Sequence, residues 1–254
     1  MTGTLDPIAA FEAERAANIA RQGDDLELAA LGIDWMLRVA PYRYSYHFSW
    51  LGRPIIQFPQ DIVAMQELVW KVRPERIVET GVAHGGSIVF HASMLELLGG
   101  EGRVMGVDID IRPHNRREIE SHPLARRIDL VEGSSIDGSV VGVVDAWAGG
   151  RRTLVVLDSH HTHDHVLAEL RAYAHLVGKD SYIVVMDTTL DDVPPNFAGE
   201  RPWGPGNSPK SAVHAFVGEC DRFEIDREYD AKLIISAARE GFLRCVADPS
   251  TASS

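Results

Sequence analysis

Short apolar runs alternate with helix-length segments along the middle of the chain. Five of these runs end in a polar residue: Arg76–Thr80, Arg103–Asp108, Ile128–Glu132, Thr153–Asp158 and Ser181–Asp187. Buried parallel strands have this near-continuous apolar pattern, and crossover helices such as those expected over Ser87–Leu98 and Thr162–Leu176 connect them. The pattern therefore predicts an α/β fold whose parallel strands carry polar residues at their carboxyl ends.

The last two apolar runs, Lys232–Ala238 and Phe242–Val246, are separated by the tight turn Arg239-Glu240-Gly241. So short a connection predicts an antiparallel hairpin. Together with the five preceding strands, it predicts a Rossmann-like, seven-stranded and mostly parallel sheet with an antiparallel terminal hairpin. This is the pattern expected of class I methyltransferases.

The first sixty residues show a different pattern of apolar and polar positions. Apolar residues from Ile8 to Ile19 recur at helical spacing, which predicts an amphipathic helix that lies on the body or on a neighbouring subunit. Aromatic residues gather over 35–59, where prolines and glycine-containing turns argue against a long regular element. We expect an N-terminal helical and aromatic cap segment, residues 1–60, and a Rossmann-like domain, residues 61–254, within one domain overall.

Composition limits the possible partners. The 254 residues include 25 Lys or Arg and 37 Asp or Glu, and the net charge of −12 argues against a nucleic-acid partner. No apolar run approaches the ~20 residues needed to cross a bilayer, and no signal-peptide pattern opens the chain. Cys220 and Cys245 show neither metal-type nor disulfide spacing. We therefore expect a cytoplasmic protein without a membrane partner.

A glycine-rich segment, Glu79–Ser87, joins the first predicted strand to the first crossover helix. Glycines let the backbone approach a ligand, and a helix N-terminus favours an anionic group. A dinucleotide fingerprint needs glycine at Ala83, so the spacing fits the acid-x-Gly-x-x-x-Gly-Gly pattern of methyltransferases better. A turn that binds no ligand is the alternative. The residues expected to hold the methionine part of S-adenosylmethionine are Glu79, Thr80, Gly81, His84, Gly85, Gly86 and Ser87.

Polar residues at the next strand ends extend this site. Asp108 ends the second strand, where an acid accepts hydrogen bonds from ribose hydroxyls, and Asp110 is the reserve candidate. Ser134 and Ser135 follow the third strand, where the adenine ring is expected. Because ligands of such sheets bind at the carboxyl ends of the strands, these segments together predict one crevice for a ribose-bearing cofactor.

Carboxylates and histidines follow the fourth and fifth strands. Adjacent strand ends would bring Asp158 and Asp187 together near the cofactor's methyl group, with Asp158 also contacting the cofactor. Two carboxylates predict a hard divalent cation such as Mg2+. A hydroxyl bound to that ion becomes more acidic, and a neutral histidine can take its proton. His161 is the first candidate for this base and His160 the second.

These residues also allow other interpretations. His161 and His165 are four residues apart and could hold zinc, but no third ligand is evident. His163 and His165 are expected to be cap or surface residues. Asp158 and Asp187 could be helix caps.

The acceptor pocket is expected to form from the early aromatic section and from the long Pro/Gly-rich loop Val193–Pro209, since long loops are often lids. Aromatic rings suit sugar faces and flat polyketides alike, although any one of them could instead be a core or subunit-contact residue. The candidates for this pocket are Tyr44, Tyr46, Trp50, Asp191, Asp192, Phe197 and Trp203.

The chain resembles the cephalosporin hydroxylase / rhamnosyl O-methyltransferase family from end to end. The matching stretches are Tyr44–Pro54, Glu79–Ser87, Leu157–Tyr173, Ser181–Thr188 and Gly241–Arg244. The resemblance implies S-adenosylmethionine as cofactor, a magnesium ion, and methylation of hydroxyls, often on deoxysugars of glycosylated natural products. It also favours a homo-oligomer.

By position, the resemblance places metal ligands at Asp158 and Asp187 and a general base at His161. One residue departs from the family pattern: an acid usually stands directly before Asp187, and here it is Met186. A thioether is a poor magnesium ligand. The site is therefore expected to bind metal more weakly, to recruit another oxygen donor, or to work without metal.

We therefore expect a small-molecule O-methyltransferase that acts on a sugar hydroxyl of a natural product. A NAD-dependent oxidoreductase is the first alternative, and Ala83 and the terminal hairpin argue against it. A tailoring role on a β-lactam nucleus is the second. A non-catalytic S-adenosylmethionine-binding accessory protein is the third, and Met186 is the feature that favours it.

Overall fold

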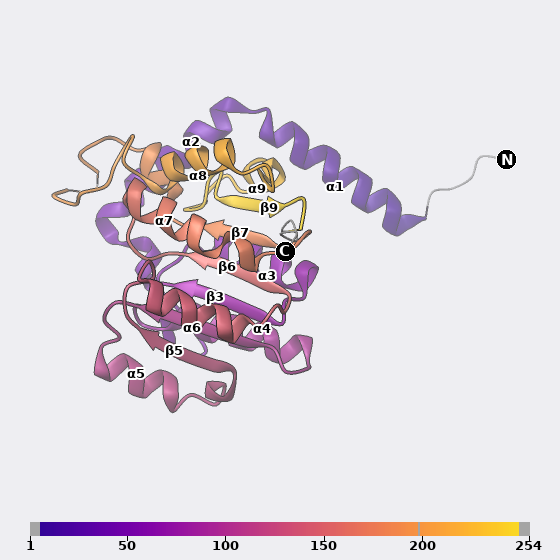
Figure 1. Cartoon of the computed structure of the whole chain (residues 1–254). Coiled ribbons are helices and arrows are strands. Elements are labelled where there is room, and N and C mark those ends of the chain that lie inside the picture. Colours follow the sequence, from indigo (N-terminus) through magenta and orange to yellow (C-terminus); the bar gives the residue numbers. More distant parts are fainter. Residues whose placement is uncertain (1–5, 198, 249–254) are drawn as a thin grey trace.

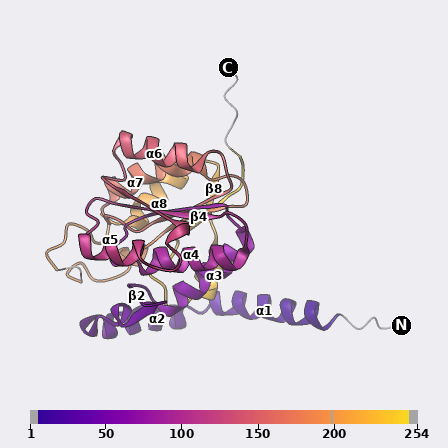
Figure 2. The same ribbon diagram turned by 90° about the horizontal axis from the view of Figure 1, so that it is seen from below.

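A seven-stranded sheet lies between two layers of helices in the computed structural model, which describes residues 6–197 and 199–248 (Figures 1 and 2). The strand order is β5-β4-β3-β6-β7-β9-β8. The strands are β3 (Arg76–Thr80), β4 (Arg103–Asp108), β5 (Ile128–Glu132), β6 (Thr153–Leu157), β7 (Tyr182–Val185), β8 (Phe223–Ile225) and β9 (Phe242–Cys245). The first five pair in parallel, and β9 is antiparallel to both β7 and β8.

Helices cover both faces of this sheet (Figure 2). One face carries α3 (Pro59–Val72), α4 (Gly86–Leu98) and α5 (Pro113–Glu120), and the other carries α6 (Gly138–Ala148), α7 (His163–Tyr173) and α8 (Pro209–Glu219). Alternate strand residues supply the two core layers, with Val184 in the first and Ile183 in the second. Full burial of one such aliphatic side chain contributes about 1.5–3 kcal/mol.

The five parallel strands and the seven-stranded sheet confirm the predicted fold class. The predicted terminal hairpin was wrong in its first strand. Residues 233–238 form no strand: α9 (Arg227–Lys232) ends at Lys232, and β9 pairs instead with β8. Both edges of β9 are already occupied by β7 and β8, so residues 233–238 have no free edge to join.

The N-terminal segment contains more helix than predicted. After α1 (Pro7–Gly23) comes α2 (Leu26–Val39), whose last residues fall in the section expected to be irregular. The short helices η1 (Ala40–Tyr42) and η2 (Tyr44–His47) and the hairpin of β1 (Phe48–Trp50) and β2 (Arg53–Ile55) follow. Figure 2 shows α1 extending beyond the body, and none of its 17 residues is buried.

The domain boundary at residue 60 stays a prediction, and residues 1–5, 198 and 249–254 of the two predicted ranges lie outside the described residues. None of the helices that the structure describes combines the length and apolar composition needed to cross a membrane.

Candidate active site

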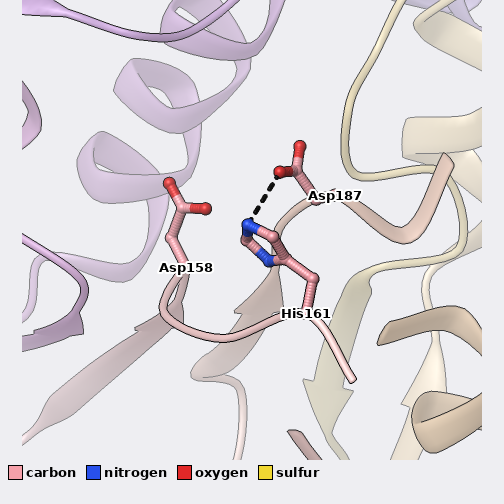
Figure 3. A group of neighbouring side chains, drawn as sticks. All are labelled: Asp158, His161 and Asp187. Carbon is pink, nitrogen blue, oxygen red and sulfur yellow. Dashed lines mark ion pairs between the residues drawn. The ribbon is translucent and has the colours of Figure 1, made fainter. Parts of the chain in front are cut away.

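Three polar side chains meet where β6 and β7 end (Figure 3). Asp158 follows β6, His161 lies between β6 and α7, and Asp187 follows β7. One donor atom of each lies within 4.8 Å of the others, and His161 Nε2 is 3.1 Å from Asp187 Oδ2. The structure thus brings together the residues predicted as base and metal ligands, and their roles stay predictions.

The backbone at Asp187 is left-handed, with φ of 57°. Aspartate tolerates this conformation better than most residues because its short polar side chain can bond locally. The turn continues into η5 (Thr188–Asp191), where the Thr189 hydroxyl donates to the carbonyl of Ser236 at 2.7 Å. This contact anchors the turn and so fixes where the Asp187 carboxylate lies.

Negative charge accumulates around Asp158. Burial, and then the charges of Asp187, Glu79, Glu169 and Asp61, raise the pKa of Asp158 well above its ordinary value. Among the described residues, no Lys or Arg forms an ion pair with Asp158 or Asp187. Two carboxylates and an imidazole with uncompensated charge are a donor set that fits a divalent cation.

Met186 does not join this group. Its side chain is 3% exposed and packs in the core layer with Met65 and Val184. The residue before Asp187 therefore supplies no ligand to the cluster, because its side chain belongs to the apolar interior.

A cavity of about 450 Å³ lies beside Asp158, at the point where the strand order reverses between β3 and β6. This is where open α/β sheets bind ligands. Five of the residues predicted to bind the cofactor line it, and they are Gly81, Asp108, Ser134, Ser135 and Asp158.

Asp108 also has a local structural role. Its Oδ2 accepts hydrogen bonds from the backbone N–H groups of Val82 (2.8 Å) and Ala83 (3.2 Å), and its Oδ1 accepts one from Asp110 (3.1 Å). The carboxylate thus braces the glycine-rich loop against β4 while facing the cavity. Its contact with a ribose stays a prediction.

Glu79 and Thr80 do not line this cavity. Glu79 is 1% exposed, accepts a hydrogen bond from the Ser87 hydroxyl, and lies 2.9 Å from Nε2 of His91 on α4. Thr80 is completely buried. Glu79 therefore connects the end of β3 with α4, and the cofactor contacts of both residues stay a prediction.

Gly81, His84, Gly85 and Gly86 also make close packing contacts, and their cofactor contacts stay a prediction. A Cβ atom at Gly81, where φ is 94°, would overlap the carbonyl oxygen of Asp158, and one at Gly86 would overlap that of Pro54. His84 contributes its carbonyl oxygen, which accepts from Arg53 Nη2 at 2.7 Å. Gly85 and Gly86 thus allow the loop and α4 to approach β2 and α5 closely.

His165, predicted to be a surface residue, instead lines the cavity. Its Nε2 lies 3.2 Å from the hydroxyls of Ser135 and Ser159 and 3.5 Å from Oε1 of the buried Glu169. The i, i+4 spacing of His165 and Glu169 on α7 was the sequence signal for this pair. His160 lines the same cavity, and partial desolvation and the charges of His165 and His161 lower the pKa of His160.

A second cavity, of about 240 Å³, is bordered by Asp187. Tyr44, Tyr46 and Phe197 line it, as predicted for an acceptor pocket, together with Met36 from α2. The acceptor role of these residues stays a prediction.

Trp203 lies close to the cluster, with its ring centroid 5.0 Å from that of His161 and 5.3 Å from that of His160. The loop that carries Trp203 therefore reaches over the histidines. Asp192, at the start of the same loop, pairs with Lys210 of α8 at 2.6 Å. This ion pair connects the start of the loop with α8, the helix that follows the loop.

Trp50 and Asp191 have structural partners, and their predicted acceptor contacts stay a prediction. The Trp50 indole N–H donates to the Ser93 hydroxyl at 3.0 Å, and its ring packs edge-on against Phe90, both on α4. Asp191 accepts a hydrogen bond from the backbone N–H of Gly206 at 2.6 Å. Trp50 therefore fixes the β1–β2 hairpin to the body, and Asp191 holds the long loop in place.

A doubly wound sheet of this order, with a cavity at its switch point and carboxylates at the next two strand ends, defines a class I methyltransferase fold and site. The family model described as "Rhamnosyl O-methyltransferase/CmcI" matches residues 42–246, and the chain belongs to this family. The prediction of a S-adenosylmethionine-dependent O-methyltransferase is thereby confirmed.

The chain is similar to several known proteins. The rhamnosyl O-methyltransferase of Mycobacterium bovis is 29% identical over 193 residues, which cover 72% of each chain. That of Mycobacterium leprae is 27% identical over 204 residues, covering 77% of this chain and 82% of the other. A Mg–SAM structure of CmcI shares the fold at 21% identity, with a TM-score of 0.54 over 80% of this chain and 78% of that one.

Proposed function

We propose that the enzyme transfers the methyl group of S-adenosylmethionine to a hydroxyl of a deoxysugar on a glycosylated natural product. The observation that carries this proposal is that the three-residue cluster borders two cavities. Asp158 lines the 450 Å³ cavity and Asp187 borders the 240 Å³ cavity. A methyl donor in the first and a hydroxyl in the second would meet beside His161.

His161 is the proposed general base. Its Nε2–H donates to Asp187 Oδ2, 3.1 Å away, so Nδ1 of the neutral ring would accept the acceptor's proton during the transfer, and Asp187 would stabilise the imidazolium that forms. S-adenosylmethionine, when bound, supplies the electrophilic methyl group. Binding of the two reactants in these cavities would remove much of the entropic part of the barrier.

Asp158 and Asp187 would hold a magnesium ion, which would polarise the acceptor hydroxyl and lower its pKa. The uncompensated charge around Asp158 supports this proposal, as does the presence of magnesium in a CmcI structure. His161 lies within reach of the same ion, but imidazole is a weaker partner than carboxylate for magnesium. A ring nitrogen of His161 is thus left to accept the proton of the acceptor hydroxyl.

The shape and chemistry of the second cavity favour a deoxysugar. At about 240 Å³ it is smaller than the ~300–1,000 Å³ typical of whole-ligand pockets, so one ring enters and the rest of the acceptor extends beyond. Met36, Val39 and Leu190 give it an apolar lining that suits a methyl group in place of a sugar's outer hydroxyl. Tyr44 adds an aromatic face for the ring. The names of the mycobacterial relatives, rhamnosyl O-methyltransferases, support the same acceptor class.

Titration calorimetry of the purified protein tests the cofactor. S-adenosylhomocysteine is expected to bind with a micromolar Kd, and NAD is expected to give no heat. Absence of S-adenosylhomocysteine binding in the presence and absence of Mg2+ would contradict the proposal.

An activity assay with the single purified protein tests the acceptor. Turnover of a rhamnosylated acceptor would show that the protein is an enzyme and not an accessory protein. Turnover of a cephalosporin nucleus instead would assign the β-lactam role.

We also propose a cytoplasmic homo-oligomer in which α1 contacts a second copy. Ile8 and Phe11 are 72% and 61% exposed on the part of α1 that extends beyond the body (Figure 1). The C-terminal end of α1 is held by the Gln22 amide, which donates to the carbonyl of Ala231 at 2.9 Å. The exposed end of a helix fixed in this way is suited to burial against a partner.

Replacing both Ile8 and Phe11 with glutamate is therefore expected to lower the molar mass measured by light scattering to that of one chain. Ala17→Glu, an exposed site on the opposite side of α1, is the matched control and should leave the mass unchanged. An unchanged mass in the double variant would place the contact elsewhere.

A further inference from the structure

Asp61 is a buried carboxylate that the proposed chemistry does not use. It lies in the first turn of α3 and is 1% exposed. Its Oδ2 accepts a hydrogen bond from the backbone N–H of Ala237 at 2.9 Å. Its Oδ1 has no hydrogen-bond partner among the described residues. An ionised carboxylate in such a place destabilises a fold unless another charge compensates it.

A chain of hydrogen bonds connects Asp61 with the turn that carries Asp187. Ala237 donates to Asp61 on one side. On its other side, the Ala237 carbonyl accepts from the Thr188 hydroxyl and from the Thr189 backbone N–H, both at 3.2 Å. Asp61 therefore supports, through one residue, the two threonines that follow Asp187.

Asp61 also acts electrostatically on this cluster. Burial and the charge of Asp187 raise the pKa of Asp61 to about 6, although hydrogen bonds from the Ser236 side chain and the Ala237 N–H oppose this rise. The charge of Asp61 in turn contributes to the raised pKa of Asp158. In the part of the chain that the structure describes, Asp61 forms no ion pair with a basic residue. Three carboxylates thus share one uncompensated region.

We infer that Asp61 supports the proposed cation site without being a ligand. It positions the turn that carries Asp187 and adds a third negative charge to the site. Asp61 is absent from the group of donor atoms within 4.8 Å of one another, so it acts through the Asp187 turn and the electric field rather than as a direct ligand. Because Met186 is buried and apolar, Asp61 supplies the negative charge that an acid before Asp187 would supply. This inference rests on the proposed function of the site.

Asp61→Asn separates the charge from the hydrogen bond. The asparagine oxygen can still accept from Ala237, while the charge is lost. The Kd for Mg2+, measured by calorimetry on the protein without substrate, is expected to rise about tenfold, within the range found for residues that support metal ligands. The metal-free variant is expected to unfold at a higher temperature than wild type at pH 8, because a buried charge has been removed. A purely structural role of Asp61 would not produce these two opposite effects.

Asp230→Asn is the matched control. Asp230 Oδ1 accepts a hydrogen bond from the Glu240 N–H at 2.6 Å, its Oδ2 lies 3.5 Å from Arg227 Nη1, and burial raises the pKa of Asp230. It lies on α9 and is not among the charges that act on Asp158. Its asparagine variant should therefore keep the wild-type Kd for Mg2+.

The outcomes of this experiment are distinct. An unchanged Mg2+ affinity in Asp61→Asn, with affinity lost in Asp158→Asn, would overturn the role of Asp61 and leave the proposed site intact. If wild type and Asp158→Asn bind Mg2+ alike, the proposed metal site fails and the inference with it. An unchanged Kd for S-adenosylhomocysteine shows that Asp61→Asn has folded.

Discussion

Replacing His161 with glutamine is expected to lower kcat by about 100-fold to 10,000-fold, which is the range that a positioned general base contributes. Glutamine keeps a polar side chain of similar reach beside Asp187 but cannot accept the acceptor's proton. His161 belongs to the cluster that borders the two cavities and does not line the larger one. The Kd for S-adenosylhomocysteine should therefore stay the same, and single-turnover kinetics with a rhamnosylated acceptor would measure the chemical step separately.

His163→Gln is the control for this experiment. His163 lies two residues further along the same loop, at the start of α7, and its Nδ1 is 2.9 Å from the Ser211 hydroxyl. As a substitution outside the cluster, it should change kcat by no more than about twofold. Wild-type turnover in His161→Gln would contradict the proposed base, and His160, which lines the larger cavity, would be the next candidate.

The sheet was predictable wherever burial leaves a strong pattern in the sequence. All five residues of β6 are buried because helices cover both faces of the sheet, so the strand is an unbroken apolar run. The three residues of β8 carry no such pattern, and their pairing depends on β9, which is distant in the sequence. Residues 233–238 are apolar because they pack against the body, and apolar character alone does not distinguish such a segment from a strand.

The site was predictable as far as strand ends determine it. Asp158 and Asp187 follow neighbouring parallel strands, so topology alone places them together. The directions of other side chains depend on packing that the sequence does not reveal. Trp50 turns toward α4, while His165 turns into the cavity because Glu169 lies one helical turn further along α7. An aromatic residue or a histidine near a site in the sequence therefore needs a structure before it is given a role.

Asp158→Asn is expected to abolish both Mg2+ binding and methyl transfer while making the metal-free protein more stable at pH 8. Burial and neighbouring carboxylates raise the pKa of Asp158 in the folded protein above its ordinary value. When folding raises the pKa of a group, that group contributes to the stability of the folded protein. The contribution is complete at pH values below the group's ordinary pKa and is lost as the pH rises through the folded-state pKa. Wild-type protein without metal should therefore lose stability as the pH rises above about 4, and the asparagine variant should lose less.

Mg2+ should reverse this loss in wild type only. A ligand at 100 times its Kd stabilises the folded state by about 2.7 kcal/mol, which corresponds to a rise in Tm of about 5–10 °C for a chain of this size. Because the ion binds the ionised carboxylate, the rise should grow with pH, whereas in Asp158→Asn it should vanish at every pH. Thermal unfolding of both proteins at pH 5 and pH 8, with and without Mg2+, gives the four rises in Tm to be compared. A rise in Tm of equal size in both proteins would show that the ion binds elsewhere, and the proton transfer would then depend on the His161–Asp187 pair alone.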